Sequence, residues 1–241
     1  MANPYFRFKQ FTVYHHLSAM KVTTDACLFG AWVAAQLQKE KETFFQALDI
    51  GTGTGLLSLM VVQKNKAHLD AVEIDAGAAQ QARDNFAQSP WAQKLHLVEG
   101  DVNAVALEPQ YDCIISNPPF YENDLTSPHK GRNLAHHSQQ LKLEQLFGLI
   151  AQKLKANGSF FLLLPFKRKE EIELLLQQKG LHIHAELWAQ QTINHTPFRL
   201  LLQGGKAPKD QKGWETISIK DAAGQYTPPF VQLLQDYYLY L

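Results

Sequence analysis

The chain has little of what marks several protein classes. It has two cysteines among its 241 residues, Cys27 and Cys113, and both lie in apolar runs without metal-ligand spacing. We therefore expect buried free thiols in a reducing compartment, and no metal site. No apolar run approaches the length of a membrane span, and the first residues lack the apolar core of a signal peptide. The expectation is a cytoplasmic protein with no membrane segment.

The chain also has no excess of either charge, because 23 basic residues balance 23 acidic ones. A net charge of zero argues against a protein that coats nucleic acid by bulk attraction. Basic residues nevertheless gather in three segments, 1–21, 121–142 and 199–212. Each segment alone is typical of solvated surface. The three form one phosphate-facing rim only if the fold brings them together.

Short apolar runs alternate with helix-like segments along the middle of the chain, and this alternation predicts an α/β fold with a doubly wound, mostly parallel sheet. The last pair of runs, 181–188 and 198–203, has a short connection, which predicts an antiparallel pair at the edge of a seven-stranded sheet. The expected strands are 44–50, 68–74, 95–99, 111–116, 159–164, 181–188 and 198–203, and the helices between them 56–63, 76–87, 143–155 and 167–178.

We expect extensions at both ends of this unit. Residues 1–40 contain two strand-like pieces and a helix over 25–38, and residues 204–241 contain a strand over 216–219 and a final helix. Asn157-Gly158 is a typical helix stop, so the helix that begins near Leu143 should end there. The simplest account is a single domain over residues 1–241, acting as a monomer.

A glycine-rich turn follows the first expected strand of the central unit. Asp49 precedes it, and Gly51, Gly53 and Gly55 let the backbone turn tightly and approach a ligand closely. Glu73 ends the next strand, where a carboxylate can accept hydrogen bonds from both hydroxyls of a ribose. This combination predicts an adenosine-type cofactor.

The turn resembles the first motif of class I S-adenosylmethionine-dependent methyltransferases, because Leu56 stands where a dinucleotide site has its third glycine. By this resemblance S-adenosylmethionine is the cofactor, and the fold is Rossmann-like. The resemblance further implies that Asp49 helps order the methionyl end of the cofactor and that Asp101 bonds its adenine amine.

The fourth strand ends in Asn117-Pro118-Pro119-Phe120. Two prolines hold a rigid, extended turn whose carbonyl groups are free to accept hydrogen bonds. An amide before the turn and an aromatic ring after it suit a planar amino group. An ordinary strand-ending turn is the competing interpretation, since Asn-Pro pairs commonly begin turns.

In class I methyltransferases this motif is typical of enzymes that methylate an exocyclic or amide nitrogen. The resemblance implies that the Asn117 side chain and the Pro118 carbonyl accept the two N–H bonds, and that Phe120 stacks on the target. The motif does not distinguish adenine N6 from guanine N2 or a glutamine side chain. The loop that follows, with Tyr121, His129 and Lys130 among its residues, would contact a base turned out of its stack.

The two ends of the chain narrow the choice. The segments 8–13 and 20–32, together with 226–239, resemble the bacterial family that methylates N6 of the adenine beside the anticodon of a valine tRNA. The resemblance covers nearly the whole chain and implies cofactor-side contacts from Lys21, Thr23 and Asp25. Two residues depart from the family pattern: Thr23 replaces the usual glycine, and Phe120 the usual tyrosine.

The leading hypothesis is therefore a tRNA adenine-N6 methyltransferase. The same chemistry on ribosomal RNA guanine, DNA adenine or a release-factor glutamine stays open, as does a non-catalytic RNA-binding module. A DNA enzyme would normally add a target-recognition domain, and a glutamine enzyme a helical N-terminal domain. Intact cofactor and Asn-Pro-Pro-Phe motifs argue against a pure binding module.

Overall fold

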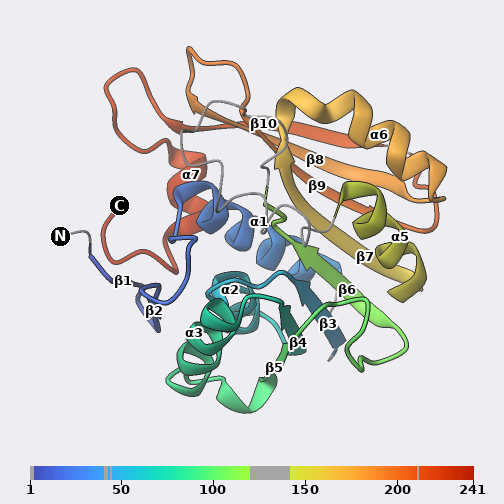
Figure 1. The fold of residues 1–241 in the computed structure, drawn as a ribbon. Coiled ribbons are helices and arrows are strands. Elements are labelled where there is room, and N and C mark those ends of the chain that lie inside the picture. Colours follow the sequence, from blue (N-terminus) through green and yellow to red (C-terminus); the bar gives the residue numbers. More distant parts are fainter. Residues whose placement is uncertain (1–2, 41–42, 44, 120–141, 211) are drawn as a thin grey trace, which may run out of the picture.

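The computed structural model describes residues 3–40, 43, 45–119, 142–210 and 212–241. An eight-stranded sheet with the order β10-β8-β9-β7-β6-β3-β4-β5 forms the centre of the molecule (Figure 1). Its strands are β3 (Phe45–Ile50), β4 (Ala67–Glu73), β5 (Leu95–Glu99), β6 (Tyr111–Ser116), β7 (Leu154–Pro165), β8 (His182–Thr192), β9 (Arg199–Gly205) and β10 (Gly213–Lys220). β9 is antiparallel to both of its neighbours, and the other pairings are parallel. The expected doubly wound, mostly parallel sheet is confirmed.

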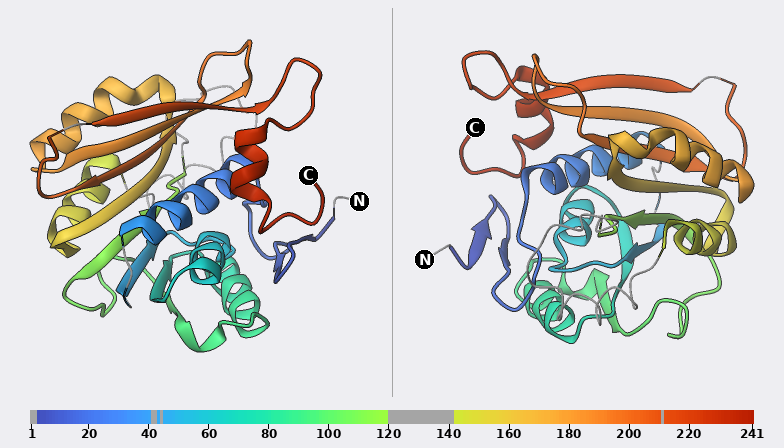
Figure 2. Two further views of the ribbon diagram at one scale, coloured as in Figure 1. Left: turned by 180° about the vertical axis from the view of Figure 1, so that it is seen from behind. Right: turned by 45° about the horizontal axis from the view of Figure 1, so that its top comes forward.

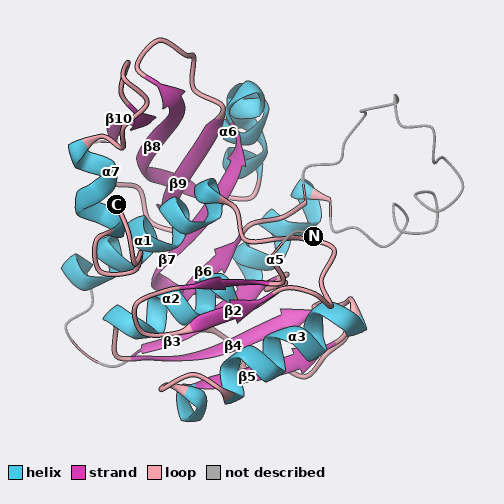
Figure 3. Cartoon of the chain, turned by 90° about the vertical axis from the view of Figure 1, so that its left-hand side faces the viewer, coloured by secondary structure: helices cyan, strands magenta, loops and turns pink. Residues whose placement is uncertain are grey.

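Helices cover both faces of the sheet (Figures 1 and 3). They are α1 (Thr24–Glu40), α2 (Leu56–Lys64), α3 (Ala76–Ala87), α5 (Leu143–Lys153), α6 (Lys169–Gln178) and α7 (Pro228–Leu234), with short 3₁₀ turns at Ala92–Lys94 and Phe166–Arg168. Alternate residues of β3 enter different cores, Ala47 with α1 and α2, and Leu48 with α5. This is the period-two pattern of a strand buried on both faces, and it explains the continuous apolar run in the sequence.

Two predictions about the sheet are wrong. It has eight strands rather than seven, because β10 pairs in parallel with β8 and so belongs to the main sheet instead of an extension. The antiparallel strand β9 lies inside the sheet, between β7 and β8, while β10 forms the edge. A hairpin connection determines that β8 and β9 are antiparallel, but it leaves open which other strands pair with them.

The predicted helix stop at Asn157-Gly158 is also wrong. α5 ends at Lys153, and β7 begins at Leu154, so Asn157 and Gly158 lie within the strand. The pairing between β6 and β7 is irregular here, since the register shifts between Tyr111 and Cys113. A glycine in a strand often accompanies such an irregularity, and Asn157 and Gly158 lie in the part of β7 where the register shifts.

The two ends of the chain lie side by side (Figure 2). The N-terminal hairpin pairs β1 (Tyr5–Arg7) with β2 (Thr12–Tyr14), and Phe8 forms an isolated bridge with Tyr238. The amide of Lys9 donates to the carbonyl of Tyr237 at 2.8 Å. Aromatic contacts between Phe8 and Tyr238 add to this packing. The terminal segments are therefore mutually supporting parts of one core.

The basic segment 199–212 is divided between the two opposite ends of the strands. Arg199 begins β9 beside the end of β7, whereas Lys209 and Lys212 follow β9, where the parallel strands begin. Lys209 pairs with Glu40 at 3.2 Å, and Lys212 with Glu173 at 2.7 Å. The fold does not gather this segment into one rim, and most of the segment 121–142 lies outside the described residues.

Both cysteines are buried free thiols, as expected. Among the described residues no helix combines the length and apolar character of a membrane span.

The tight insertion of β9 generates a stability prediction. Gly204 pairs with Phe160 of β7 and Ile183 of β8, and a Cβ there would overlap the His182 carbonyl oxygen and the Phe160 ring. Gly204→Ala should therefore lower the free energy of unfolding by about 1–3 kcal/mol in urea titrations. The matched control is Gly148→Ala in α5, where a Cβ meets nothing within 4 Å. It should stabilise by up to about 1 kcal/mol. Equal effects of the two substitutions would contradict this packing.

Candidate active site

The glycine turn joins the end of β3 to the start of α2. Gly51 and Gly53 have φ angles of 71° and 58°, which lie in the left-handed region that favours glycine. A Cβ at either position would meet no atom within 4 Å, so the outer face of the turn is open. Gly55 differs, because its Cβ would overlap the ring of Phe86 on α3. Two glycines therefore expose backbone to a ligand, and the third permits close packing beneath it.

Asp49 lies buried below the turn, in the last part of β3. Its Oδ2 accepts hydrogen bonds from the hydroxyls of Thr52 and Ser58, each at 2.7 Å. Its Oδ1 is buried and has no hydrogen-bond partner. Burial raises the pKa of Asp49 to about 6, and the nearby charge of Glu73 adds to the rise, against the hydrogen bonds from Thr52 and Ser58, which lower the pKa. An unpaired, buried carboxylate oxygen costs stability, which makes Asp49 a candidate for contact with a ligand donor.

Glu73 ends β4 beside the same turn and is largely buried. Its Oε2 accepts from the amide of Gly53 at 2.8 Å, and its Oε1 accepts from the amide of Asp75 at 2.9 Å. Asp75 in turn caps α3, because its side chain accepts from the amide of Ala78 at 2.8 Å. The carboxylate predicted to bind a ribose thus also holds the glycine turn against the start of α3.

Asp101 follows β5 at the same edge of the sheet. Gly100, directly before it, donates its amide to the carbonyl of Glu73 at 2.8 Å, so the ends of β4 and β5 are joined there. Asp101 is exposed, and its Oδ1 accepts from the backbone and side-chain nitrogens of Asn103, each at 2.9 Å. This local turn orients Asp101 at the edge where an adenine is expected.

Asn117 follows β6 directly, next to the glycine turn. β3 and β6 are parallel neighbours with Ile50 opposite Ser116, and the Ser116 hydroxyl donates to the Ile50 carbonyl at 2.8 Å. Gly51 and Asn117 are the residues that follow these two strands, so they leave the sheet at the same level, about one strand spacing of 4.8 Å apart. The structure thus brings the glycine turn and the Asn-Pro-Pro segment together.

The neighbouring prolines differ in exposure. Pro118 is buried and Pro119 is exposed, while Asn117 is half-buried. Phe120 lies outside the described residues, as do the residues of the following loop that are expected to contact RNA, Tyr121, His129, Lys130, Arg132, His136 and His137.

Sequence reasoning missed two polar residues on the inner face of α3. The Asn85 side chain donates to the carbonyls of Thr54 and Tyr14, at 2.8 and 2.9 Å, and accepts from the Tyr14 amide at 3.0 Å. Gln81 accepts from the amide of Leu17 at 3.1 Å. These bonds hold the segment after β2 against α3 and the glycine turn. The sequence did contain a signal for these contacts, because Gln81 and Asn85 place side-chain amides on the otherwise apolar inner face of α3.

The segment predicted to contact the cofactor lies between β2 and the first turn of α1. Lys21 is an exposed residue of this connection. Thr23 lies directly before α1, and its backbone carbonyl accepts a hydrogen bond from the Cys27 amide at 3.1 Å. Asp25 pairs with Arg199 of β9 at 2.7 Å. The Asp25 carboxylate is therefore directed to the β9 side of the sheet edge.

These residues fit S-adenosylmethionine. The turn offers open backbone at Gly51 and Gly53, and Asp49 offers an unpaired oxygen to a cationic amino group. Glu73 and Asp101 add acceptors at successive strand ends, as a ribose and an adenine amine require. Among the described residues no group of three or more His, Cys, Asp or Glu side chains is arranged to hold a metal ion.

The strand order and this turn define the class I methyltransferase fold. The structure resembles a predicted O-methyltransferase from Agrobacterium tumefaciens, with a TM-score of 0.64 at 18% identity, over 88% of this chain and 96% of that one. It also resembles a proposed class I S-adenosylmethionine-dependent methyltransferase from Listeria monocytogenes, with a TM-score of 0.62 at 17% identity, over 82% and 68% of the two chains.

Sequence similarity is more specific. Residues 30–173 match the family described as methyltransferase small domain. A protein of Phocaeicola vulgatus named tRNA1(Val) (adenine(37)-N6)-methyltransferase is 38% identical over 239 residues, which cover 99% of both chains. The chain belongs to this tRNA1(Val) (adenine(37)-N6)-methyltransferase family.

The buried carboxyl of Asp49 generates a pH prediction for the cofactor-free protein. Its folded pKa of about 6 lies above the ordinary value of 3.8, so the folded state binds the proton more tightly than the unfolded chain. The contribution of the protonated Asp49 to the free energy of unfolding is fully present below pH 3.8 and is lost as the pH rises through about 6. Relative to Asp49→Asn, wild type should lose about 2 kcal/mol of unfolding free energy between pH 4.5 and 7.5. Urea titrations that give a pH-independent difference would contradict the burial argument.

Proposed function

We propose that the protein transfers a methyl group from S-adenosylmethionine to the exocyclic N6 of adenine 37 in a valine tRNA, the reaction that the name of its relative describes. The observation that carries this proposal is the pairing of Ile50 with Ser116, because it sets the glycine turn beside Asn117. A cofactor cradle and a pair of amino-group acceptors then occupy adjacent strand ends.

The chemistry asks the protein for placement and electrostatics. S-adenosylmethionine supplies an electrophilic methyl group on a sulfonium ion. The Asn117 Oδ1 and the Pro118 carbonyl accept the two N–H bonds of the adenine amino group, which aims its lone pair at that methyl group. With the cofactor bound, the sulfur–carbon bond would break as the nitrogen–carbon bond forms, and the resulting cationic nitrogen would release its proton to water. Catalysis therefore rests on orientation, without a protein nucleophile.

The Asn-Pro-Pro turn has the rigidity that this orientation needs. Pro118 is buried and its ring fixes its own φ angle, while the following Pro119 restricts the ψ angle of Pro118 and with it the direction of the Pro118 carbonyl. Phe120 is proposed to stack on the adenine ring. The base must leave its stack to reach this position, which favours an exposed anticodon loop over a paired helix. We further propose that the protein acts as a cytoplasmic monomer with a single domain.

The substrate assignment is tested with tRNA from a strain that lacks the gene. Wild-type protein and labelled S-adenosylmethionine should produce N6-methyladenine in one valine tRNA, detected by nuclease digestion and mass spectrometry. Label that appears only in ribosomal RNA, DNA or protein would refute the tRNA assignment while leaving methyl transfer intact.

The role of Asn117 is tested by Asn117→Ala. Loss of the amide removes one of two acceptors, so the transfer rate should fall by at least about 100-fold, as for the loss of one preorganised hydrogen bond in other enzymes. Cofactor affinity, measured by calorimetry, should stay near wild type. The control Asn157→Ala changes an exposed asparagine at the far edge of the sheet and should leave the rate unchanged. An Asn117→Ala variant with wild-type turnover would show that this side chain does not orient the acceptor.

A further inference from the structure

A cavity separate from the glycine turn opens at the carboxyl ends of the parallel strands, the same side of the sheet as the proposed transfer site. Its volume is about 300 Å³, at the lower end of the range for small-molecule sites. The first turn of α1 forms one wall, with Thr23 and Thr24. The ends of β8 and β10 and the residue before β9 form the others, with Gln191, Lys220 and Phe198. Thr23 and Asp25 are also expected cofactor-side contacts, whereas Gln191, Phe198 and Lys220 on the other walls have no part in the proposed methyl transfer.

Two aromatic rings line the cavity, and each lies beside a cation. The Arg199 guanidinium lies 5.3 Å from the ring centre of Phe198, and the Lys220 ammonium lies 5.7 Å from that of Tyr226. Tyr226 also stacks on the buried Phe230, with ring centres 4.7 Å apart and planes at 17°, so Phe230 and Lys220 together cover the Tyr226 ring and hold it and the ammonium in place. The half-buried Phe198 ring is the aromatic surface that suits the flat face of a nucleobase.

The charge of the cavity favours an anion. Asp25 is its acidic side chain, and the ion pair with Arg199 at 2.7 Å neutralises it. Lys220 remains as an exposed positive charge at the opening. At the start of the 17-residue helix α1 the Ala26 amide already donates to Asp25 Oδ1 and the Cys27 amide to the Thr23 carbonyl, so the hydrogen-bond donors on the opposite wall are the first two amides of the helix and the hydroxyls of Thr23 and Thr24. A phosphate between Lys220 and the start of α1 would meet donors from both sides.

Gln191 supplies what base recognition needs in addition. It is exposed on β8 and offers both an acceptor and two donors, as the edge of a base requires. Phosphate donors, an amide and an aromatic face in one cavity together match a nucleotide rather than a simple anion.

The strand order places this cavity within reach of the transfer site. Arg199 pairs with Pro165 of β7, and β7 pairs with β6, which ends before Asn117. Two strand spacings of about 4.8 Å separate Arg199 from the line of β6, and four separate Lys220 from it. A single strand that runs along this edge would cross both sites, at about 10 to 20 Å from each other.

We propose that this cavity binds a nucleotide of the RNA substrate that flanks the target adenine, with its phosphate at Lys220 and α1 and its base beside Phe198 and Gln191. The proposal rests on the proposed function. It makes Lys220 and Gln191 determinants of RNA affinity that take no part in the methyl transfer itself.

The test uses Lys220→Gln and Gln191→Ala in the full chain, with the anticodon stem-loop of the valine tRNA and S-adenosylhomocysteine. Lys220→Gln should weaken RNA binding about fivefold at low salt and reduce the slope of log affinity against log salt by about 0.7–0.9. Gln191→Ala should weaken binding with the salt slope unchanged. Both side chains are exposed, so neither change should impair folding. The affinity for S-adenosylmethionine should match wild type in both variants.

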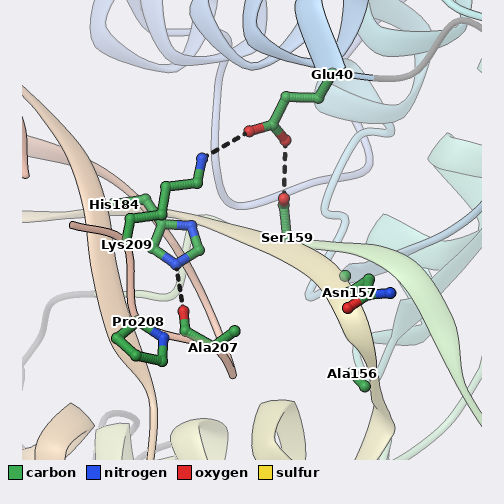
Figure 4. Close-up of a pocket in the computed structure, with 9 residues that line it drawn as sticks. Glu40, Ala156, Asn157, Ser159, His184, Ala207, Pro208 and Lys209 are labelled. Carbon is green, nitrogen blue, oxygen red and sulfur yellow. Dashed lines mark hydrogen bonds and ion pairs between the residues drawn. The ribbon is translucent and has the colours of Figure 1, made fainter. Parts of the chain in front are cut away.

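Lys209→Gln is the matched control. Lys209 lines a cavity of about 340 Å³ at the opposite edge of the sheet, where it pairs with Glu40 (Figure 4). The same loss of charge there should leave RNA affinity and the salt slope at wild-type values. Equal losses of RNA affinity in Lys209→Gln and Lys220→Gln would mean that both lysines only attract RNA non-specifically by their charge, and this result would overturn the proposal.

Two further outcomes separate this proposal from the proposed function. A wild-type protein that methylates the stem-loop, combined with a Lys220→Gln variant of unchanged affinity and salt slope, would overturn only the nucleotide cavity. Reduced affinity of Lys220→Gln for S-adenosylmethionine would overturn it as well, because the cavity would then belong to the cofactor site. A wild-type protein that neither binds nor methylates the stem-loop would overturn both proposals.

Discussion

The pairing of β3 with β6 is the constraint on which the rest of the site depends. Ile50 lies opposite Ser116 in parallel register, and the Ser116 hydroxyl donates to the Ile50 carbonyl at the last step of the pair. A shift of one residue would move both strand ends relative to each other and turn every side chain of one strand to the other face. The cofactor turn and the Asn-Pro-Pro segment share one edge because this register is held by buried strands on both sides.

The supports of the glycine turn show how stability and function are balanced. Glu73 holds the amide of Gly53, and Asn85 joins the turn to the N-terminal segment. Asp49, in contrast, has a raised pKa and a buried oxygen with no partner, which costs stability in the free protein. Such a cost is commonly found at binding sites, where a ligand supplies the missing donor. The turn is therefore preorganised by its neighbours and incomplete at one atom.

The central α/β unit could be predicted because local signals agree with the final fold there. Apolar runs, glycine turns and strand-end acids mark β3 to β6, and the structure places Asp49, Gly51, Gly53, Glu73 and Asn117 along one edge. The position of β10 could not be predicted, since strand order is decided by pairing across the sheet rather than by local pattern. Asn157-Gly158 misled for a similar reason, because a helix stop and a strand irregularity use the same residues. The cavity between Gln191 and Lys220 combines segments far apart in the chain, which no local motif reveals.

The central claim is that the cofactor and the acceptor amino group meet between Gly51 and Asn117. A crystal structure with S-adenosylhomocysteine and an adenosine-containing anticodon loop tests it most directly. The account predicts an adenine outside its stack, with N6 within hydrogen-bond distance of the Asn117 Oδ1 and the Pro118 carbonyl, and the homocysteine end of the ligand above Gly51 and Gly53. An adenine amino group bound by other residues, or a ligand bound away from the glycine turn, would contradict it.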